Sequence, residues 1–307
     1  MPLIPAGNVT LPEHRDSGGF DHAAVHAASG RVYVAHTAND AVDVFDDRQH
    51  LFSVPNLKAV AGTLVSEEAN LVFSSNRGEN TVAIFRPDPD PEVAKVKVGL
   101  GPNGLAYDPR RRLLLAANVG DATNPRSHTL TVVDVGDRAV RAEIQVPGRT
   151  RWTVFDPESE RFYVNIADPA VIAVVEAGKP NTIARTFSIP AAGPHGLDID
   201  CRTQRLFCAC DAGRLVILDA CTGKTLGERE LSGVPDVIFF NQHRGHLYVA
   251  IGDPGVIDVF DTASMDRLDR IKTEKGAHTL ALAPAGDRLY AFLPTSHRAV
   301  IYRTGAP

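Results

Sequence analysis

Residues 101–109 read Gly-Pro-Asn-Gly-Leu-Ala-Tyr-Asp-Pro, and residues 193–200 read Gly-Pro-His-Gly-Leu-Asp-Ile-Asp. Weaker copies of the same stretch occur at residues 234–238 and 276–280. Self-similarity with a period of about 40 residues decides the architecture before any local assignment, because it marks one structural unit that is repeated along the chain.

Each unit continues with short segments that are rich in apolar and β-branched residues. In one unit they lie at residues 113–117, 129–134 and 142–146, separated by polar turns with Gly, Asn and Asp. Such segments predict antiparallel strands, and no window keeps a helical period long enough to compete. One four-stranded sheet cannot bury its faces alone, whereas a closed ring of sheets can. The predicted fold class is therefore all-β: a seven-bladed β-propeller with four-stranded antiparallel blades.

The two ends of the chain complete one blade. The last copy stops after its third strand, at residues 299–303, whereas the chain opens with a segment at residues 8–12 that resembles a fourth strand. We therefore expect the N-terminal strand to pair into the last blade and close the ring. A propeller grows by adding blades around an axis, so residues 1–307 are predicted to form a single domain.

Three elements of the repeat carry a family resemblance: Gly-Pro-x-Gly, the stretch Tyr163-Val164-Asn165-Ile166, and Val-x-Val-x-Asp. Together they resemble the YVTN family of seven-bladed β-propellers, and the resemblance covers nearly the whole chain. That family includes binding proteins, and related propellers include lactonases and metal-dependent lyases. The resemblance thus implies the fold and leaves the activity to be argued from individual residues.

Composition excludes several functional classes. The chain is 44% hydrophobic and 22% charged with a formal net charge of −5, and its basic residues are scattered, so nucleic-acid binding is disfavoured. No segment resembles a signal peptide or approaches membrane-spanning length, which predicts a cytoplasmic protein without a membrane partner, a removed signal peptide being the alternative. All four cysteines lie in one unit, at 201, 208, 210 and 221, and are expected to be free thiols in the core. We expect a monomer or a weak oligomer.

One position of the repeat changes from copy to copy. At the start of the first strand the seven units place His22, Ala61, Asn103, Arg151, His195, Asp236 and His278. Because the loop into the first strand lies on the same face in every blade, these seven residues, here called the ring, are expected to line one axial funnel.

The ring predicts a metal site. Once the propeller is closed, His195, Asp236, His278 and His22 lie on four consecutive blades. Imidazole and carboxylate ligands suit zinc, manganese, iron or copper without distinguishing among them, and an open funnel leaves a coordination position for water or substrate.

The functional hypothesis is a metal-assisted hydrolase or lyase that acts on an oxyanion-bearing small molecule such as a lactone or ester. Arg151 faces the four ligands and would hold the oxyanion through its planar guanidinium. Asp198 is a candidate partner that orients one imidazole. The predicted catalytic residues are His22, His195, Asp236, His278 and Arg151, and the predicted substrate-binding residues are Asn103, Arg151, Trp152, His36 and Asn118.

Two alternatives stay open. One is a metal-free acid–base enzyme that uses the same His and Asp residues, since histidine titrates near neutrality. The other is a non-catalytic binding scaffold. No serine-nucleophile motif, phosphate-binding glycine loop or dinucleotide fingerprint occurs, so no nucleotide cofactor is expected.

Overall fold

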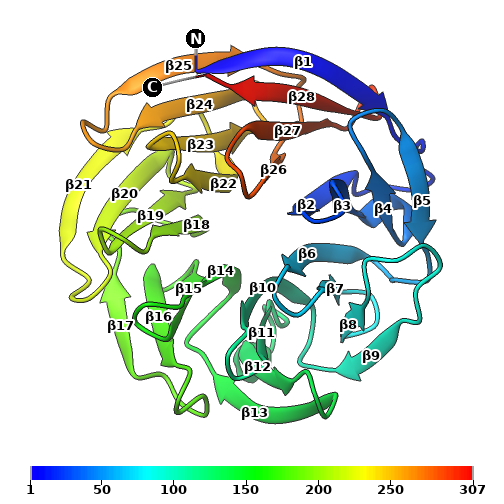
Figure 1. Ribbon diagram of the computed structural model, residues 1–307. Coiled ribbons are helices and arrows are strands. Elements are labelled where there is room, and N and C mark those ends of the chain that lie inside the picture. The colour runs from blue at the N-terminus through cyan, green and yellow to red at the C-terminus, as the bar shows by residue number, and fades with distance from the viewer. Residues whose placement is uncertain (1, 306–307) are drawn as a thin grey trace.

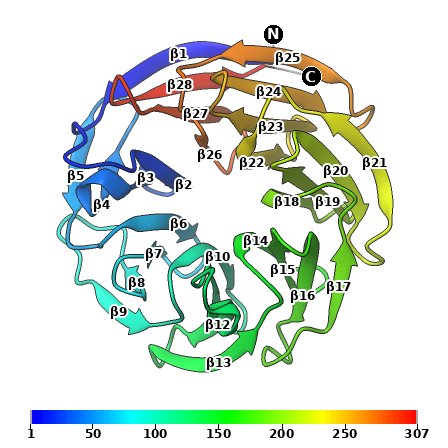
Figure 2. The same cartoon turned by 180° about the vertical axis from the view of Figure 1, so that it is seen from behind.

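A computed structural model describes residues 2–305 and confirms the predicted fold class. Its strands form seven four-stranded antiparallel sheets that surround a central axis (Figure 1; Figure 2 shows the opposite face). Six sheets follow chain order, so that the first strand of each unit is innermost and the fourth is outermost.

The strand bounds, blade by blade, are as follows. Blade one comprises β2 (Phe20–His26), β3 (Arg31–His36), β4 (Ala41–Phe45) and β5 (His50–Val54); blade two β6 (Val60–Ser66), β7 (Leu71–Asn76), β8 (Thr81–Phe85) and β9 (Ala94–Lys97); blade three β10 (Pro102–Asp108), β11 (Leu113–Asn118), β12 (Thr129–Asp134) and β13 (Ala139–Gln145). Blade four comprises β14 (Thr150–Asp156), β15 (Arg161–Ile166), β16 (Val171–Glu176) and β17 (Arg185–Ser188); blade five β18 (Pro194–Asp200), β19 (Arg205–Cys210), β20 (Arg214–Asp219) and β21 (Thr225–Glu230). Blade six comprises β22 (Pro235–Asn241), β23 (His246–Ile251), β24 (Val256–Asp261) and β25 (Arg267–Lys272); blade seven β26 (Thr279–Leu282), β27 (Arg288–Leu293), β28 (Arg298–Thr304) and β1 (Leu3–Thr10).

Two short 3-10 turns, η1 (Thr37–Asn39) and η2 (Pro125–Ser127), complete the described elements. No helix within residues 2–305 has the length and apolar character needed to cross a membrane.

The N-terminal strand closes the ring as predicted. β1 pairs antiparallel with β28, from Leu3 opposite Thr304 to Thr10 opposite Arg298, and both termini lie beside blade seven (Figure 1). Leu3 and Val9 are buried in this sheet. The last blade therefore combines both ends of the chain, and no strand edge is left open at the seam.

The hydrophobic core lies between neighbouring blades. Phe207 of blade five and Leu247 of blade six belong to one buried cluster, and similar clusters occupy the other seams. The hydroxyl of Tyr163 in blade four donates to the carbonyl of Ala220 in blade five at 3.0 Å. This packing makes the ring rigid, so residues on the innermost strands are held in fixed positions around the axis.

The four cysteines are free, as predicted, but only two of them lie in the core. Cys208 and Cys210 are buried on β19, with their sulfur atoms 3.8 Å apart, and Cys201 and Cys221 lie nearer the surface. Burial raises the pKa of the Cys208 thiol, so this side chain behaves as a neutral core residue.

A bulge at the start of the innermost strands positions the site. In blade three, Pro102 pairs with Asn118 and Leu105 pairs with Ala116, so the register shifts across Asn103 and Gly104. The same shift occurs in blades one to six. The extra residue releases this segment from the regular ladder and turns it toward the axis.

Candidate functional site

The pairing register corrects the ring in blade one. Phe20 pairs with His36 and Ala23 with Val34, so the residue that corresponds to Asn103 is Asp21. His22 lies one residue later, and the prediction that it holds the ring position is wrong by one residue. The other six ring residues lie where the sequence placed them, within or next to the first residues of the innermost strands.

His22 and Trp152 share a second special position. Blades two, three and five have Gly62, Gly104 and Gly196 there, and a Cβ atom at Gly196 would lie 2.2 Å from the carbonyl oxygen of Asp236. The rings of His22 and Trp152 stack with their centroids 3.7 Å apart and their planes at 3°. Since the two residues come from blades one and four, this stack links non-adjacent blades across the axis.

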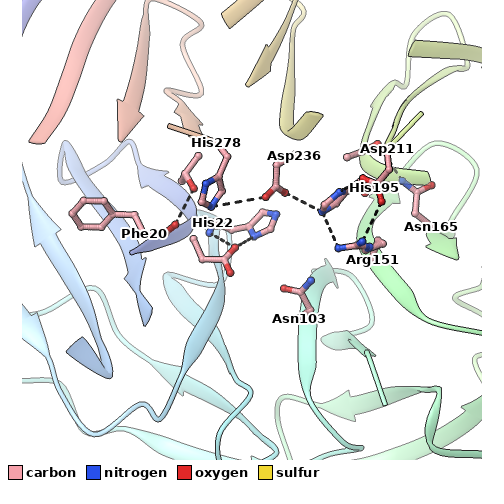
Figure 3. Close-up of polar contacts among 12 residues, drawn as sticks. Phe20, His22, Asn103, Arg151, Asn165, His195, Asp211, Asp236 and His278 are labelled. Atoms are coloured by element: carbon pink, nitrogen blue, oxygen red, sulfur yellow. Dashed lines mark hydrogen bonds and ion pairs between the residues drawn. The ribbon is translucent and has the colours of Figure 1, made fainter. Parts of the chain in front are cut away.

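His195 is held by a carboxylate. Its Nδ1 lies 2.7 Å from Oδ1 of Asp211, and because a carboxylate only accepts, Nδ1 is the donor. The Nε2 atom then faces Asp236 Oδ1 at 3.2 Å and Nη1 of Arg151 at 3.2 Å (Figure 3). Buried Asn165 fixes the backbone by donating to the carbonyls of His195 at 2.9 Å and Gly196 at 3.1 Å. The arrangement leaves Nε2 as the working atom of an oriented imidazole.

His278 lies on the other side of Asp236. Its Nδ1 donates to the carbonyl of Gly276 at 2.8 Å, and its Nε2 lies 3.9 Å from Asp236 Oδ2. Figure 3 shows His278, Asp236 and His195 in one row. Two neutral imidazoles would both point lone pairs at this carboxylate, which would be repulsive. A proton on either Nε2 atom would let that atom donate to Asp236.

Arginines dominate the opposite arc. Arg77 donates to Oδ1 of Asn103 at 2.7 Å and lies 3.2 Å from Oδ2 of Asp21. Arg151 donates to Oδ2 of Asp211 at 3.2 Å. Loss of hydration, and then the charges of Arg151 and Arg77, lower the pKa of Arg149. The three guanidinium groups therefore lie close enough to influence one another.

Two carboxyl groups respond to this charge. Burial alone would raise the pKa of Asp21, but the charge and hydrogen bond of His22, together with Arg77 and His278, hold it well below its ordinary value. Burial likewise opposes ionisation of Asp211, and the hydrogen bond and charge of His195 with the charge of Arg151 lower its pKa. Both groups are carboxylates at neutral pH and anchor the imidazoles beside them.

The predicted metal ligands do not converge on one point. The Nδ1 of His22 lies 2.6 Å from Asp21, and Arg151 occupies one side of His195 Nε2. Within residues 2–305, no group of three or more His, Cys, Asp or Glu side chains is arranged to hold a metal ion. A metal centre of three histidines and one aspartate therefore stays a prediction.

Three other predicted residues lie away from the funnel contacts. His36 is fully buried, with Nδ1 2.6 Å from Asp43 Oδ2 and Nε2 2.6 Å from His14 Nδ1. Asn118 is also fully buried and donates to two threonine hydroxyls of its own blade. Asp198 accepts from the backbone N–H groups of Phe240 and Ile199 and hydrogen-bonds to no imidazole, so it does not orient one.

Sequence reasoning missed Asp21, Arg77 and Arg149 as site residues. Asp21 directly precedes His22, the predicted ring residue. Arg77 and Arg149 follow or precede strands on the funnel face, and their side chains reach the site from the loops. Arginine in the loops on the funnel face was the sequence feature that could have predicted their part in the site.

Solved structures with this architecture have diverse roles. The chain is similar to a structure of Kuenenia stuttgartiensis hydrazine synthase, with TM-score 0.83 and 13% identity over 97% of this chain and 98% of that one. It is also similar to a chain in the crystal structure of the mitotic checkpoint complex, with TM-score 0.82 and 13% identity over 98% of this chain and 91% of that one. At this identity the likeness shows the fold alone.

No protein-family model matches the chain, and no curated protein has a matching sequence. The resemblance to YVTN-family propellers is therefore not confirmed. Enzymes and assembly components both use this fold, so the function must be argued from the site.

Proposed function

We propose that the funnel is a small-molecule site at which His195 acts as a general acid–base in the hydrolysis of a lactone or ester. The observation that carries the proposal is the contact between Asp211 and His195, which fixes the tautomer and leaves Nε2 facing the funnel. A carboxylate that orients an imidazole in this way is the arrangement by which proteins position a histidine base.

The neighbours of Nε2 support both of its protonation states. When His195 is neutral, Nε2 accepts a hydrogen bond from Arg151, 3.2 Å away. When it is protonated, Nε2 donates to Asp236 at the same distance. A proton can therefore arrive or leave at this atom without rearrangement of the side chains around it.

The proposed reaction uses this proton transfer. Nε2 removes a proton from a water molecule as its oxygen attacks the carbonyl carbon, and the electron pair of the carbonyl bond moves to the oxygen. Arg151 then stabilises the oxyanion, since its guanidinium group lies beside His195 Nε2, with Nη1 3.2 Å away. Collapse of the tetrahedral intermediate breaks the bond to the leaving alkoxide, which takes the proton back from Nε2.

A metal-assisted version of the same chemistry is the second candidate. It is favoured by one observation, the two imidazole Nε2 atoms that face the oxygens of Asp236. Elemental analysis of the purified wild type, H195Q and H278Q tests it. A stoichiometric metal that is lost in both variants supports this version, and wild-type protein that hydrolyses its substrate after chelation contradicts it.

A panel of lactones and esters tests the main proposal, with the acid product measured directly. We expect hydrolysis by the wild type and a loss of about 10²–10⁴ in the rate for H195Q. His50→Gln is the matched control, because His50 lies on the outer strand β5 and contacts Ser53. A wild type that hydrolyses no member of the panel contradicts the proposal and favours a binding scaffold.

A further inference from the structure

A second axial site extends toward the face of the propeller opposite the funnel. A cavity of about 450 Å³ is lined by the middle and end of the innermost strands and by residues of the hairpins that follow them, such as Glu67, Glu68 and Pro109. The ring residues lie at the beginning of the same strands. The cavity therefore begins beneath the ring and extends toward the other end of the axis, and it has a volume typical of pockets for small ligands, about 300–1,000 Å³.

The walls of this cavity are apolar and aromatic. Leu64, Leu105, Phe155 and Phe239 line it, together with the indole of Trp152, which also stacks on His22. Trp152 is thus a wall shared by the cavity and the funnel side. Aromatic faces of this kind attract organic cations as well as apolar groups.

All of the charged residues in the lining are acidic. They are Asp198, Glu67 and Glu68, and no lysine, arginine or histidine accompanies them in the described wall. Glu67 accepts from the backbone N–H groups of Ala27 and Ala28, which ties it to blade one. The lining therefore carries acidic groups only, in contrast to the arginines at the funnel, and Nε2 of His26 lies 3.5 Å from Glu67 Oε2 behind it.

Asp198 is the carboxyl group set deepest along the strand. Its Oδ1 accepts from Ile199 N–H at 2.8 Å and its Oδ2 from Phe240 N–H at 2.6 Å. A carboxylate has about four acceptor positions, so each oxygen keeps one free. Burial raises the pKa of Asp198 to about 6, which shows that no cationic side chain compensates it. The other blades place Leu64, Ala106 or Val154 at this position, so the repeat itself does not require a carboxyl group here.

We propose that the cavity binds an organic ammonium ion, with its N–H groups on the Asp198 carboxylate and its apolar body against the aromatic and aliphatic walls. Such a ligand supplies the missing positive charge and the donors, and it buries apolar surface. A neutral alcohol supplies only a donor, and an anion is repelled by all three carboxyl groups. This inference is independent of the chemistry proposed for His195.

Benzylammonium is the probe, with benzyl alcohol and benzoate as matched ligands of the same shape. Binding is measured by calorimetry and by the emission of Trp152, the only tryptophan of the chain. We expect benzylammonium to bind at least about tenfold more tightly than benzyl alcohol, because a hydrogen bond to a charged group contributes about 1.5–3 kcal/mol. Benzoate should not bind.

Three variants test whether the ligand binds in this cavity. D198N should weaken benzylammonium binding about tenfold or more and leave benzyl alcohol within a factor of about three. E143Q, which removes the same charge at an exposed position of the outer strand β13, is the control and should change binding less than about threefold. V65F fills the cavity while keeping Asp198, and it should weaken both ligands, which keeps the test valid if D198N folds poorly.

Three results would overturn the inference. The first is benzylammonium binding no tighter than benzyl alcohol, and the second is an unchanged affinity in folded D198N. The third is an unchanged affinity in V65F. Loss of hydrolysis in H195Q bears on none of them, so the two proposals fail separately.

Discussion

At the scale of single residues, the site depends on which atom of each imidazole is free. Asp211 and the carbonyl of Gly276 each accept a hydrogen bond from the Nδ1–H group of one histidine, and both Nε2 atoms then face Asp236. Arg151 touches both His195 and Asp211. In the proposed hydrolysis these contacts would supply a base, an anchor for its protonated form and a donor for an oxyanion within one small region.

Asp211→Asn tests the orientation of His195. An amide presents an N–H group in place of one carboxylate oxygen, so it favours the wrong tautomer and leaves the imidazolium without its counter-charge. We expect kcat of ester or lactone hydrolysis to fall about 10²–10⁴-fold with little change in KM. D253N is the control, because Asp253 is exposed in the corresponding loop of blade six and pairs with Lys275. Equal losses in both variants would contradict a role through His195.

Asp198 predicts a pH dependence of stability. Its pKa is about 6 in the folded protein, above the ordinary value near 4, so the folded state holds this proton more tightly than the unfolded chain does. Stability is therefore lost as the pH rises from about 4 to about 6. D198N cannot ionise, so the unfolding free energy of the variant relative to the wild type should increase by roughly 2–3 kcal/mol between pH 4 and pH 7.

Chemical denaturation of both proteins at the two pH values checks this. The change in unfolding free energy between the two pH values is compared in the two proteins. A hydrogen bond lost in D198N lowers its stability by a similar amount at both pH values and therefore cancels. A difference that stays constant with pH would show that Asp198 titrates at its ordinary value.

At the scale of the strand, the bulge and its glycine determine how close the blades come to the axis. The Cβ of an alanine at Gly196 would lie 2.2 Å from the carbonyl oxygen of Asp236, and at Gly104 it would lie 2.6 Å from that of Arg151. Close approach of backbone to backbone thus requires glycine at these points, and it sets the positions of the ring residues on the next blade.

Gly196→Ala tests this coupling. The backbone of blade six must move away, so we expect a loss of about 1–3 kcal/mol in unfolding free energy and a displaced Asp236. G178A is the control, because nothing lies within 4 Å of a Cβ there. Thermal and chemical unfolding measure both variants, and a G196A protein as stable as G178A would refute the tight contact.

The strand register also explains the one misplaced ring residue. In blades three and five the sequence Gly-Pro-x-Gly marks the bulge, so Asn103 and His195 can be aligned with each other. Blade one reads Gly-Phe-Asp-His over residues 19–22, so Gly19 matches the first glycine, but phenylalanine and histidine replace the proline and the second glycine. A slip of one residue turns a side chain to another face, so only the pairing with β3 identifies Asp21. The sequence also does not indicate which atoms a long side chain contacts. Arg77 donates to Asn103 from a neighbouring loop, and His36 is buried beneath the funnel.

At the scale of the whole molecule, the fold was predictable because the same strand and turn pattern recurs in every blade. Each unit needs neighbours to bury its faces, and the two incomplete units at the chain ends have only each other to pair with. The site is different, since it exists where the repeat is broken. Its position was predictable from the ring, whereas the contacts among its members depend on distances that no single unit encodes.

Removal of residues 1–10 tests the closure. It exposes the edge of β28 and the partners of Leu3 and Val9, whose burial contributes about 1.5–3 kcal/mol each. We expect a loss of roughly 3–6 kcal/mol in unfolding free energy, self-association through the open edge, and recovery on addition of a peptide of residues 2–12. A truncated protein that is monomeric and as stable as the full chain would contradict the role of β1.

The most direct test of the proposed function is a comparison of kcat/KM for the best lactone or ester substrate in chelator-treated wild type, H195Q and H50Q. The account predicts that the treated wild type and H50Q hydrolyse the substrate at similar rates and that H195Q, still folded, is at least about 10²-fold slower. Equal rates in H195Q and the wild type, or no hydrolysis by any of the three, would contradict it.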